Sequence, residues 1–302
     1  MFYKFMLAIV SVCLLTLTNS IYAIEFQIPR DDSRLVGELT YYTVQDGDHF
    51  QSIAEKYRVG YLAMMEANPG VDPLRPKVGT ELVIPTQMIL PYVKQDGIVI
   101  NLSELRLYYF DKQRDTVHVF PVGIGKIGDM TPRLVSKITE KRKNPNWYPT
   151  ANTRREYLAK NGKPMPKMIP AGPQNPLGDY AMRIGNSAYL IHGTNQRFGI
   201  GMRVSAGCIR MYPADIEWLF NNTPKGTAVR IIDQPIKMTY LEPDVRMIEI
   251  HAPLTSNNGE VPSLLPLSLG VQNFIGDNPE KIELVEELLD APTGLPLLLD
   301  RR

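Results

Sequence analysis

The first clear pattern of apolar and polar positions lies between residues 41 and 86. Alternation over residues 41–44 predicts a strand, and the apolar run at 82–85 predicts a second one. Between them, helical spacing predicts two helices, the second ending at the Asn-Pro-Gly sequence of residues 68–70. The apolar positions of these helices are Ile53, Ala54 and Tyr57, then Leu62, Met65 and Ala67. The order strand, helix, helix, strand predicts a small α+β module.

After a short proline-containing linker at residues 86–95, the pattern changes to short alternating strands separated by glycine and proline turns. One clear helix is predicted over residues 213–221, so this second region is expected to be mainly β. Residues 144–178 are rich in proline and lack apolar periodicity, which is typical of a functional lid. Three aromatic side chains of this lid are candidates to line a substrate groove: Trp147, Tyr148 and Tyr157.

The chain beyond residue 234 is predicted to be an extension without an assigned role. From Gly259 onward it is acidic. Apolar positions Ile282, Val285 and Leu288 follow a helical spacing within residues 280–289. We expect one helix there, docked on another part of the protein.

Residues 1–23 resemble a cleaved export signal. Lys4 supplies positive charge, an apolar run over residues 5–17 is too short to span a bilayer comfortably, and Ala23 is suitable for signal peptidase. Cys13 lies within the apolar run and is interpreted as part of it rather than as a lipid attachment site. The mature protein is therefore expected in the periplasm, with no transmembrane segment.

Composition narrows the functional classes. The 302 residues suggest about two domains. With 33 Lys plus Arg against 32 Asp plus Glu, the chain lacks the cationic excess that nucleic acids or anionic membrane surfaces require. We therefore expect no nucleic-acid partner.

Cysteine usage points to specific chemistry. Without Cys13, Cys208 is the only thiol in a protein predicted to be exported, where cysteines usually pair. It could be a buried small hydrophobe, half of an intermolecular disulfide, or a nucleophile. Three cations, Arg197, Arg203 and Arg210, surround it in sequence and favour the nucleophile, because positive charge lowers the pKa of a thiol.

A nucleophilic thiol needs a base, and His192 is the natural candidate. It follows the apolar residues 189–191, which predict a buried strand, and precedes a glycine. A structural role for a histidine at a strand end is the alternative. The rival histidines, His49, His118 and His251, lack a comparable glycine-rich turn, and no zinc-binding motif is present.

These residues resemble a known family. The sequence Ile-His-Gly-Thr-Asn at 191–195, followed by Ser-Ala-Gly-Cys-Ile-Arg-Met at 205–211, is similar to the signature of the L,D-transpeptidase (YkuD-type) catalytic domain. The resemblance covers residues 95–233 and implies a β-sandwich. Residues 41–86 resemble a LysM domain, a βααβ unit that binds N-acetylglucosamine glycans. The whole resembles the enterobacterial branch that includes ErfK and YbiS, although Ala206 stands where the family often has histidine.

The resemblance implies roles for the site residues. Cys208 attacks the bond between meso-diaminopimelate and D-Ala in a peptidoglycan stem, and His192 transfers protons. The carbonyl of Gly193 orients the imidazole, while the backbone N–H groups of Gly207 and Cys208 form an oxyanion hole. Three further residues are expected at the substrate: Arg210, which could instead brace the loop, with Ser205 and Thr194. No metal and no cofactor are implied.

The sequence does not identify the acceptor of the acyl group. It could be the C-terminal lysine of Braun-type lipoprotein, a second diaminopimelate amine giving a 3-3 crosslink, or water. Residues 194–201 resemble the ErfK and YbiS branch, which favours lipoprotein. A sortase-like or papain-like enzyme fits the motif and residue order less well, and a non-catalytic wall-binding protein is the alternative of another class. The LysM-like module and the catalytic domain are expected to act independently.

Overall fold

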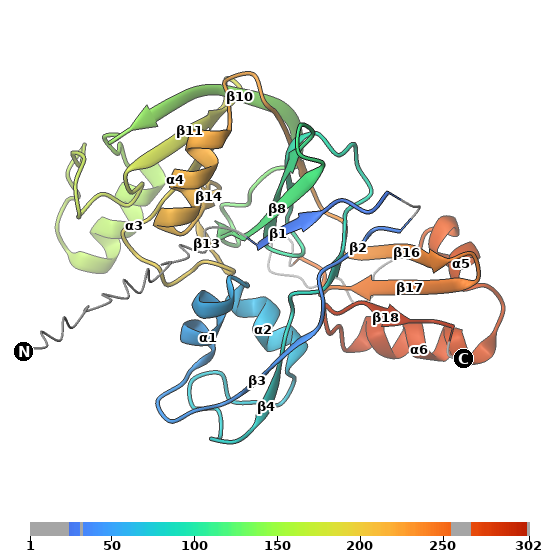
Figure 1. Cartoon of the computed structure of the whole chain (residues 1–302). Coiled ribbons are helices and arrows are strands. Elements are labelled where there is room, and N and C mark those ends of the chain that lie inside the picture. Colours follow the sequence, from blue (N-terminus) through green and yellow to red (C-terminus); the bar gives the residue numbers. More distant parts are fainter. Residues whose placement is uncertain (1–23, 31–32, 255–266, 301–302) are drawn as a thin grey trace, which may run out of the picture.

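The computed structural model describes residues 24–30, 33–254 and 267–300, which form three units packed against one another (Figure 1). The expected export signal at residues 1–23, with Cys13, lies outside these ranges. No helix within the described ranges is both long enough and apolar enough to cross a membrane.

The first unit has the predicted βααβ order. It comprises β3 (Thr40–Thr43), α1 (Phe50–Tyr57), α2 (Tyr61–Ala67) and β4 (Glu81–Ile84), with β3 and β4 antiparallel. The imidazole of His49 caps α1, because its Nδ1 accepts a hydrogen bond from the Ser52 amide at 3.0 Å. The buried residues Phe50, Ile53, Met64 and Leu82 share one core.

The face of α2 that packs inside this unit differs from the prediction. Met64, not Met65, is fully buried in the unit's own core, and Met65 is 38% exposed. Leu62 packs instead against the core of the second unit. The helix therefore has two apolar faces because it lies between two units, which spacing alone does not reveal.

The second unit is built on a nine-stranded sheet, so the predicted mainly β fold is confirmed. In spatial order its strands are β1 (Ile24–Gln27), β8 (Thr116–Pro121), β7 (Arg106–Asp111), β6 (Gly97–Asn101), β15 (Ala228–Ile232), β10 (Leu134–Lys143), β11 (Tyr180–Ile184), β12 (Leu190–His192) and β14 (Ile209–Arg210). Two short pairs flank it: β2 (Leu35–Val36) with β5 (Met88–Ile89), and β9 (Ile124–Gly125) with β13 (Arg203–Ser205).

The long strand β10 joins the two halves of this sheet. Its first residues pair with β15 and its later residues with β11, and the register shifts between Ile138 and Glu140. A bulge of this kind bends a strand and increases its twist. Buried side chains from both halves, including Ile100 of β6 and Met182 of β11, consequently belong to one core.

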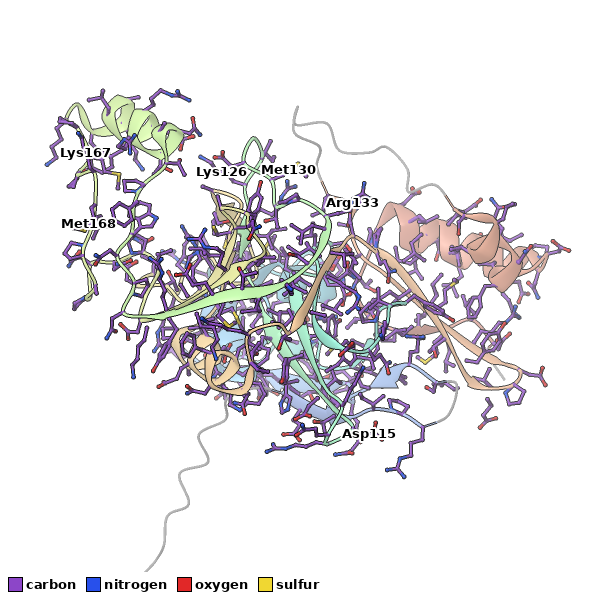
Figure 2. The ribbon with its side chains drawn as sticks, turned by 90° about the horizontal axis from the view of Figure 1, so that it is seen from above. Asp115, Lys126, Met130, Arg133, Lys167 and Met168 are labelled. Atoms are coloured by element: carbon purple, nitrogen blue, oxygen red, sulfur yellow. The ribbon has the colours of Figure 1, made fainter. Side chains whose placement is uncertain are left out.

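Two helices complete the second unit. The helix α4 (Pro213–Asn222) forms where the sequence predicts it and buries Ile216 and Leu219 against the sheet core. The expected lid contains α3 (Ala151–Asn161), none of whose residues is buried. Figure 2 shows Lys167 and Met168, from the same lid, projecting from the body of the molecule beside α3.

The C-terminal unit is larger than the single docked helix expected from the sequence, and that expectation is wrong. It contains a three-stranded sheet of β16 (Ile236–Glu242), β17 (Val245–Ile250) and β18 (Leu297–Leu298). Two helices, α5 (Leu269–Ile275) and α6 (Pro279–Asp290), pack on it. Val285 and Leu288 are buried as the spacing indicated, whereas Ile282 is 39% exposed.

A buried polar cluster connects the three units. Glu104 of the second unit and Glu249 of the C-terminal unit each lie 2.9 Å from the ammonium of Lys237, which is fully buried. The imidazole of His251 bridges Glu249 at 2.7 Å and Glu66, on α2 of the first unit, at 2.9 Å. Arg106 adds a third cation, 3.0 Å from Glu104.

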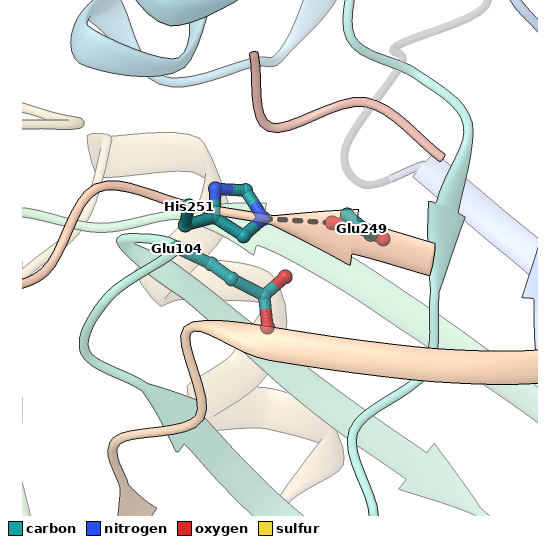
Figure 3. Close-up of side chains that lie close together, drawn as sticks. All are labelled: Glu104, Glu249 and His251. Carbon is teal, nitrogen blue, oxygen red and sulfur yellow. Dashed lines mark hydrogen bonds and ion pairs between the residues drawn. The ribbon is translucent and has the colours of Figure 1, made fainter. Parts of the chain in front are cut away.

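Charges within this cluster compensate one another. Although burial favours the neutral acid, Lys237, His251 and Arg106 hold the pKa of Glu249 at about 2. Burial also opposes the charge on His251, but Glu66 and Glu249 raise its pKa to about 9. Polar atoms of Glu104, Glu249 and His251 lie within 4.8 Å of one another, as metal ligands do (Figure 3). Because Lys237 and Arg106 already neutralise the carboxylates, we interpret this cluster as structural.

Replacing Lys237 with Met is expected to lower the free energy of unfolding by about 3–5 kcal/mol, because it leaves two buried carboxylates short of a cation. Urea unfolding of the full chain measures this. The exposed Lys225→Met is the matched control and should change little. Equal unfolding curves for the two variants would show that the cluster contributes no net stability.

Candidate active site

The predicted base, His192, is the last residue of β12 and its side chain is buried. Its Nδ1 lies 2.6 Å from the carbonyl oxygen of Gly193. A carbonyl only accepts hydrogen bonds, so Nδ1 carries the proton and Nε2 has a free lone pair. Burial and the nearby charge of Arg210 lower the pKa of His192 to about 4, against a smaller opposing effect of the Gly193 carbonyl. The imidazole is therefore neutral at pH 7.

Strand pairing brings Cys208 to the same place. In the parallel ladder of β12 and β14, Ile191 pairs with Ile209 and His192 with Arg210. Side chains of paired residues lie on one face of a sheet, so His192 and Arg210 point to the same face. Cys208 directly precedes β14, so this pairing brings it close to β12. Both Cys208 and His192 line one cavity of about 260 Å³.

The electrostatic state of the thiol differs from the sequence expectation. Burial raises the pKa of Cys208, and this outweighs the lowering effects of the Leu190 amide, Arg210 and Arg183. The cations near Cys208 in the sequence favour a thiolate, but desolvation, which depends on the fold, disfavours it. Since His192 is neutral as well, the resting pair is a neutral thiol beside a neutral imidazole rather than an ion pair.

The peptide that precedes Cys208 is held by a residue that the sequence did not indicate. Gly207 has φ +94°, and the buried Thr131 hydroxyl donates to its carbonyl oxygen at 2.9 Å. In a trans peptide the next N–H points the opposite way, so the amide of Cys208 faces away from Thr131. A Cβ on Gly207 would lie 2.8 Å from the ring of Tyr189, which favours glycine here. No motif marks Thr131, because it acts across 76 residues of chain.

Two residues expected at the substrate have their hydroxyls engaged elsewhere. The hydroxyl of Ser205 donates to the carbonyl of Cys208 at 2.5 Å, and it closes the turn that presents the thiol. The hydroxyl of Thr194 donates to the carbonyl of Gln196 and accepts from the Gln196 amide, both at 3.0 Å. These contacts stabilise the loops on either side of the site. Ser205 also lines the cavity at Cys208, and Thr194 lines a neighbouring cavity, so their contact with substrate stays a prediction.

The side chain of Arg210, unlike the hydroxyls of Ser205 and Thr194, is not fully engaged within the described part of the protein. Its backbone pairs with Gly123, but among the described residues its Nε is buried without a hydrogen-bond partner. Its side chain lines both the cavity at Cys208 and a second cavity of about 390 Å³. Of the two roles considered from the sequence, bracing the loop and binding substrate, this arrangement favours binding an anionic group.

The second cavity adjoins the first and shares part of its lining, including Ser205. It is lined by parts of the lid, such as Glu156 of α3, and by the loop at 194–196. Trp147, Pro176 and Ala206 line both cavities. Of the predicted lid aromatics, Trp147 and Tyr148 line the cavity at Cys208, and Tyr157 is not among its lining residues.

The other histidines have separate roles in the described part of the chain. His49 caps a helix, and His251 belongs to the interdomain cluster. His118 is buried with its ring 4.2 Å from that of Trp218. His192 is the only histidine among the residues lining the cavity at Cys208.

The first unit is docked on the loop that leads to Cys208, so the expected functional independence of the two units becomes a question of whether this contact positions the loop. The amide of Leu62 donates to the carbonyl of Gly201 at 3.1 Å. A Cβ on Gly201 would lie 2.3 Å from the Tyr61 amide nitrogen, so the two backbones touch. Arg58 after α1 lies 3.2 Å from the buried Asp215 of α4, and Arg197 pairs with Glu55.

We expect Gly60→Val, in the full-length chain, to lower turnover of a soluble stem peptide by about one to two orders of magnitude. The Cβ at Gly60 would already lie 3.2 Å from Gly201 Cα, so a larger side chain pushes the loop that carries Cys208. Gly270→Val is the control, because a Cβ there would meet only the Ser268 hydroxyl, at an ordinary contact distance of 3.7 Å. Unchanged turnover in Gly60→Val would restore the view that the two units work independently.

Known proteins and protein families match each of the three units of the chain. Family models match for the L,D-transpeptidase catalytic domain (YkuD) at residues 95–231, the LysM domain at 42–85 and the L,D-transpeptidase C-terminal domain at 235–299. The chain is 44% identical to "Probable L,D-transpeptidase YcfS" of Escherichia coli (strain K12) over 277 residues, 89% of this chain and 86% of that one. It is 46% identical to "Probable L,D-transpeptidase ErfK/SrfK" of Salmonella typhimurium, covering 91% of each. Identity to "Probable L,D-transpeptidase YbiS" of E. coli (strain K12) is 44%, covering 92% of each.

Proposed function

The chain belongs to the L,D-transpeptidase family, and from this premise we propose that it is a periplasmic cysteine acyltransferase acting on peptidoglycan. The proposed donor is a tetrapeptide stem, cleaved between meso-diaminopimelate and D-Ala. We infer that the acceptor is the C-terminal lysine of a Braun-type lipoprotein, since residues 194–201 resemble the ErfK and YbiS branch. The same chemistry with a second diaminopimelate amine, or with water, gives a 3-3 crosslink or an L,D-carboxypeptidase.

One observation carries the proposal. The only free cysteine in the described chain and the only histidine of its cavity line the same wall region: His192 ends β12, and Cys208 directly precedes the neighbouring strand β14. The imidazole has its lone pair free at Nε2, because Nδ1 is bound to Gly193. A nucleophile, a base and an orienting group are the parts that covalent acyl transfer needs.

In the proposed acylation step, the thiol proton moves from Cys208 to Nε2 of His192 as sulfur attacks the carbonyl carbon. The oxyanion that forms accepts hydrogen bonds from backbone amides, of which that of Cys208 is held in place through Thr131 and Gly207. The C–N bond then breaks, His192 gives its proton to the leaving amine of D-Ala, and a thioester remains.

In the second step, a neutral amine attacks the thioester and gives a proton to His192. The thiolate leaves and recovers that proton, which restores both groups. The two cavities that meet at Ala206 and Arg210 provide separate approaches for donor and acceptor. The LysM domain is proposed to bind the glycan strand, which raises the local concentration of stems at Cys208.

The test uses the purified full-length mature protein with a disaccharide tetrapeptide. Free D-Ala and peptide products are measured by mass spectrometry without an acceptor, with a peptide ending in lysine, and with excess tetrapeptide. We expect D-Ala release together with a lysine-linked product. Release without any amine-linked product would identify a carboxypeptidase, and no release under any condition would favour a non-catalytic wall-binding protein.

A further inference from the structure

A cluster of charged side chains lines the far side of the cavity at Cys208. Glu140 and Arg142 come from β10 and Arg183 from β11. Nε of Arg183 donates to one oxygen of Glu140 at 3.0 Å, and Nε of Arg142 donates to the other. Nη1 of Arg183 donates to the carbonyl of Ser187 at 2.9 Å. The cluster is therefore held from several sides.

Strand register connects this cluster to the nucleophile. Glu140 pairs with Arg183 on β11, which pairs with Leu190 on β12. The ladder of β12 and β14, continued by one residue, places Cys208 beside Leu190. Neighbouring strands are about 4.8 Å apart, so the Cα atoms of Arg183 and Cys208 are about 10 Å apart. About three residues of an extended peptide span that distance.

The charge of the cluster is unbalanced. Hydrogen bonds from Arg142 and Arg183 lower the pKa of Glu140, which is thus ionised at neutral pH. One carboxylate then serves two guanidinium groups, which leaves one net positive charge. Among the described residues, the Nη2 group of Arg183 and both Nη groups of Arg142 have no hydrogen-bond partner. A guanidinium fork with free N–H groups is suited to a carboxylate.

Simple surface ion pairing is the alternative explanation. The side chains of Glu140 and Arg183 are 33% and 37% exposed, and exposed pairs contribute little to stability. Two features favour a binding site. The cluster lines the cavity that contains the thiol, and Arg183 is close enough to Cys208 for its charge to lower the pKa of the thiol slightly, less than the Leu190 amide or Arg210 does.

We propose that Arg183, oriented by Glu140 and assisted by Arg142, binds a carboxylate of the donor stem peptide. Arg210, on β14, lines the same cavity and provides a second guanidinium group there. This inference rests on the proposed function. The donor offers two suitable carboxylates near the scissile bond: that of the terminal D-Ala and that of the diaminopimelate side chain.

The test compares the full-length wild type with Arg183→Gln on three tetrapeptides: unmodified, amidated at the diaminopimelate side chain, and amidated at D-Ala. On the unmodified peptide, Arg183→Gln is expected to lower kcat/KM of D-Ala release by about 10- to 100-fold, as for a lost charge-assisted hydrogen bond. On the peptide that lacks the recognised carboxylate, kcat/KM of the wild type should fall to the value of Arg183→Gln on the unmodified peptide. On that same peptide, Arg183→Gln should cause no further loss of kcat/KM. The amidated position at which wild type and Arg183→Gln no longer differ in kcat/KM identifies the carboxylate that Arg183 binds.

Arg230→Gln is the control, because Arg230 lies on β15, outside the lining of this cavity, and donates to the Asp96 carbonyl. Thermal unfolding checks that each variant is folded. An equal loss on all three peptides would mean that Arg183 acts only through the thiol or the fold, and no loss on any would mean a surface ion pair. Either result overturns the inference while wild-type D-Ala release upholds the proposed function. Absence of release from the wild type would instead overturn the function itself.

Discussion

Replacing Cys208 with Ala or Ser is expected to abolish both D-Ala release and acyl transfer. Alanine has no nucleophile, and the hydroxyl of serine ionises far less readily than a thiol, so neither can form the thioester. Mass spectrometry should detect a covalent acyl adduct on the wild type and none on either variant. The fold should persist, because the turn is closed through the backbone carbonyl of residue 208 by Ser205.

A matched control returns the thiol to the same turn at another position. In Cys208→Ala combined with Ala206→Cys, the new thiol lies at an exposed residue that also lines the cavity but is two positions further from β14 than Cys208 is. This double variant should be as inactive as Cys208→Ala. Transfer at the wild-type rate by Cys208→Ala would mean that another group is the nucleophile.

The second large effect is expected from His192→Ala, which should lower the acylation rate by a factor on the order of 10² to 10⁴. In the proposed mechanism the imidazole accepts the thiol proton, and the raised pKa of Cys208 leaves little thiolate available without that base. Rapid-quench measurement of acyl-enzyme formation tests this directly. His118→Ala, which removes a buried imidazole from another part of the sheet, is the control and should retain the acylation rate.

The pH dependence tests the same assignment from another side. His192 acts as a base only when unprotonated, and its pKa is lowered to about 4. The acid limb of kcat/KM should therefore fall as pH drops through about 4, not through the ordinary histidine value of about 6.5. An acid limb near 6.5 would indicate an exposed imidazole or a different base. A near-normal acylation rate in His192→Ala would assign the proton transfer to another group.

Much of the fold could be predicted because it depends on local periodicity. The βααβ order of residues 41–86 and the helix α4 both follow from apolar spacing and turn residues that lie within a few positions of each other. The C-terminal unit could not be predicted in the same way. Its strand β18 is only two residues long and pairs with β17 although α5 and α6 lie between them in the chain, so no local pattern marks it.

The sequence by itself determined the chemical components of the site: one thiol, one histidine before a glycine, and the small residues around them. The motif that resembles the L,D-transpeptidase signature selected these residues, since function constrains their identity and spacing. Tertiary structure decided their environment. The pairing of Ile191 with Ile209 brings Cys208 and His192 into one cavity, and Thr131 reaches Gly207 from a distant loop. Burial, which sums contributions from the whole fold, sets the pKa of both reacting groups, and so the neutral resting pair could not be derived from nearby charges alone.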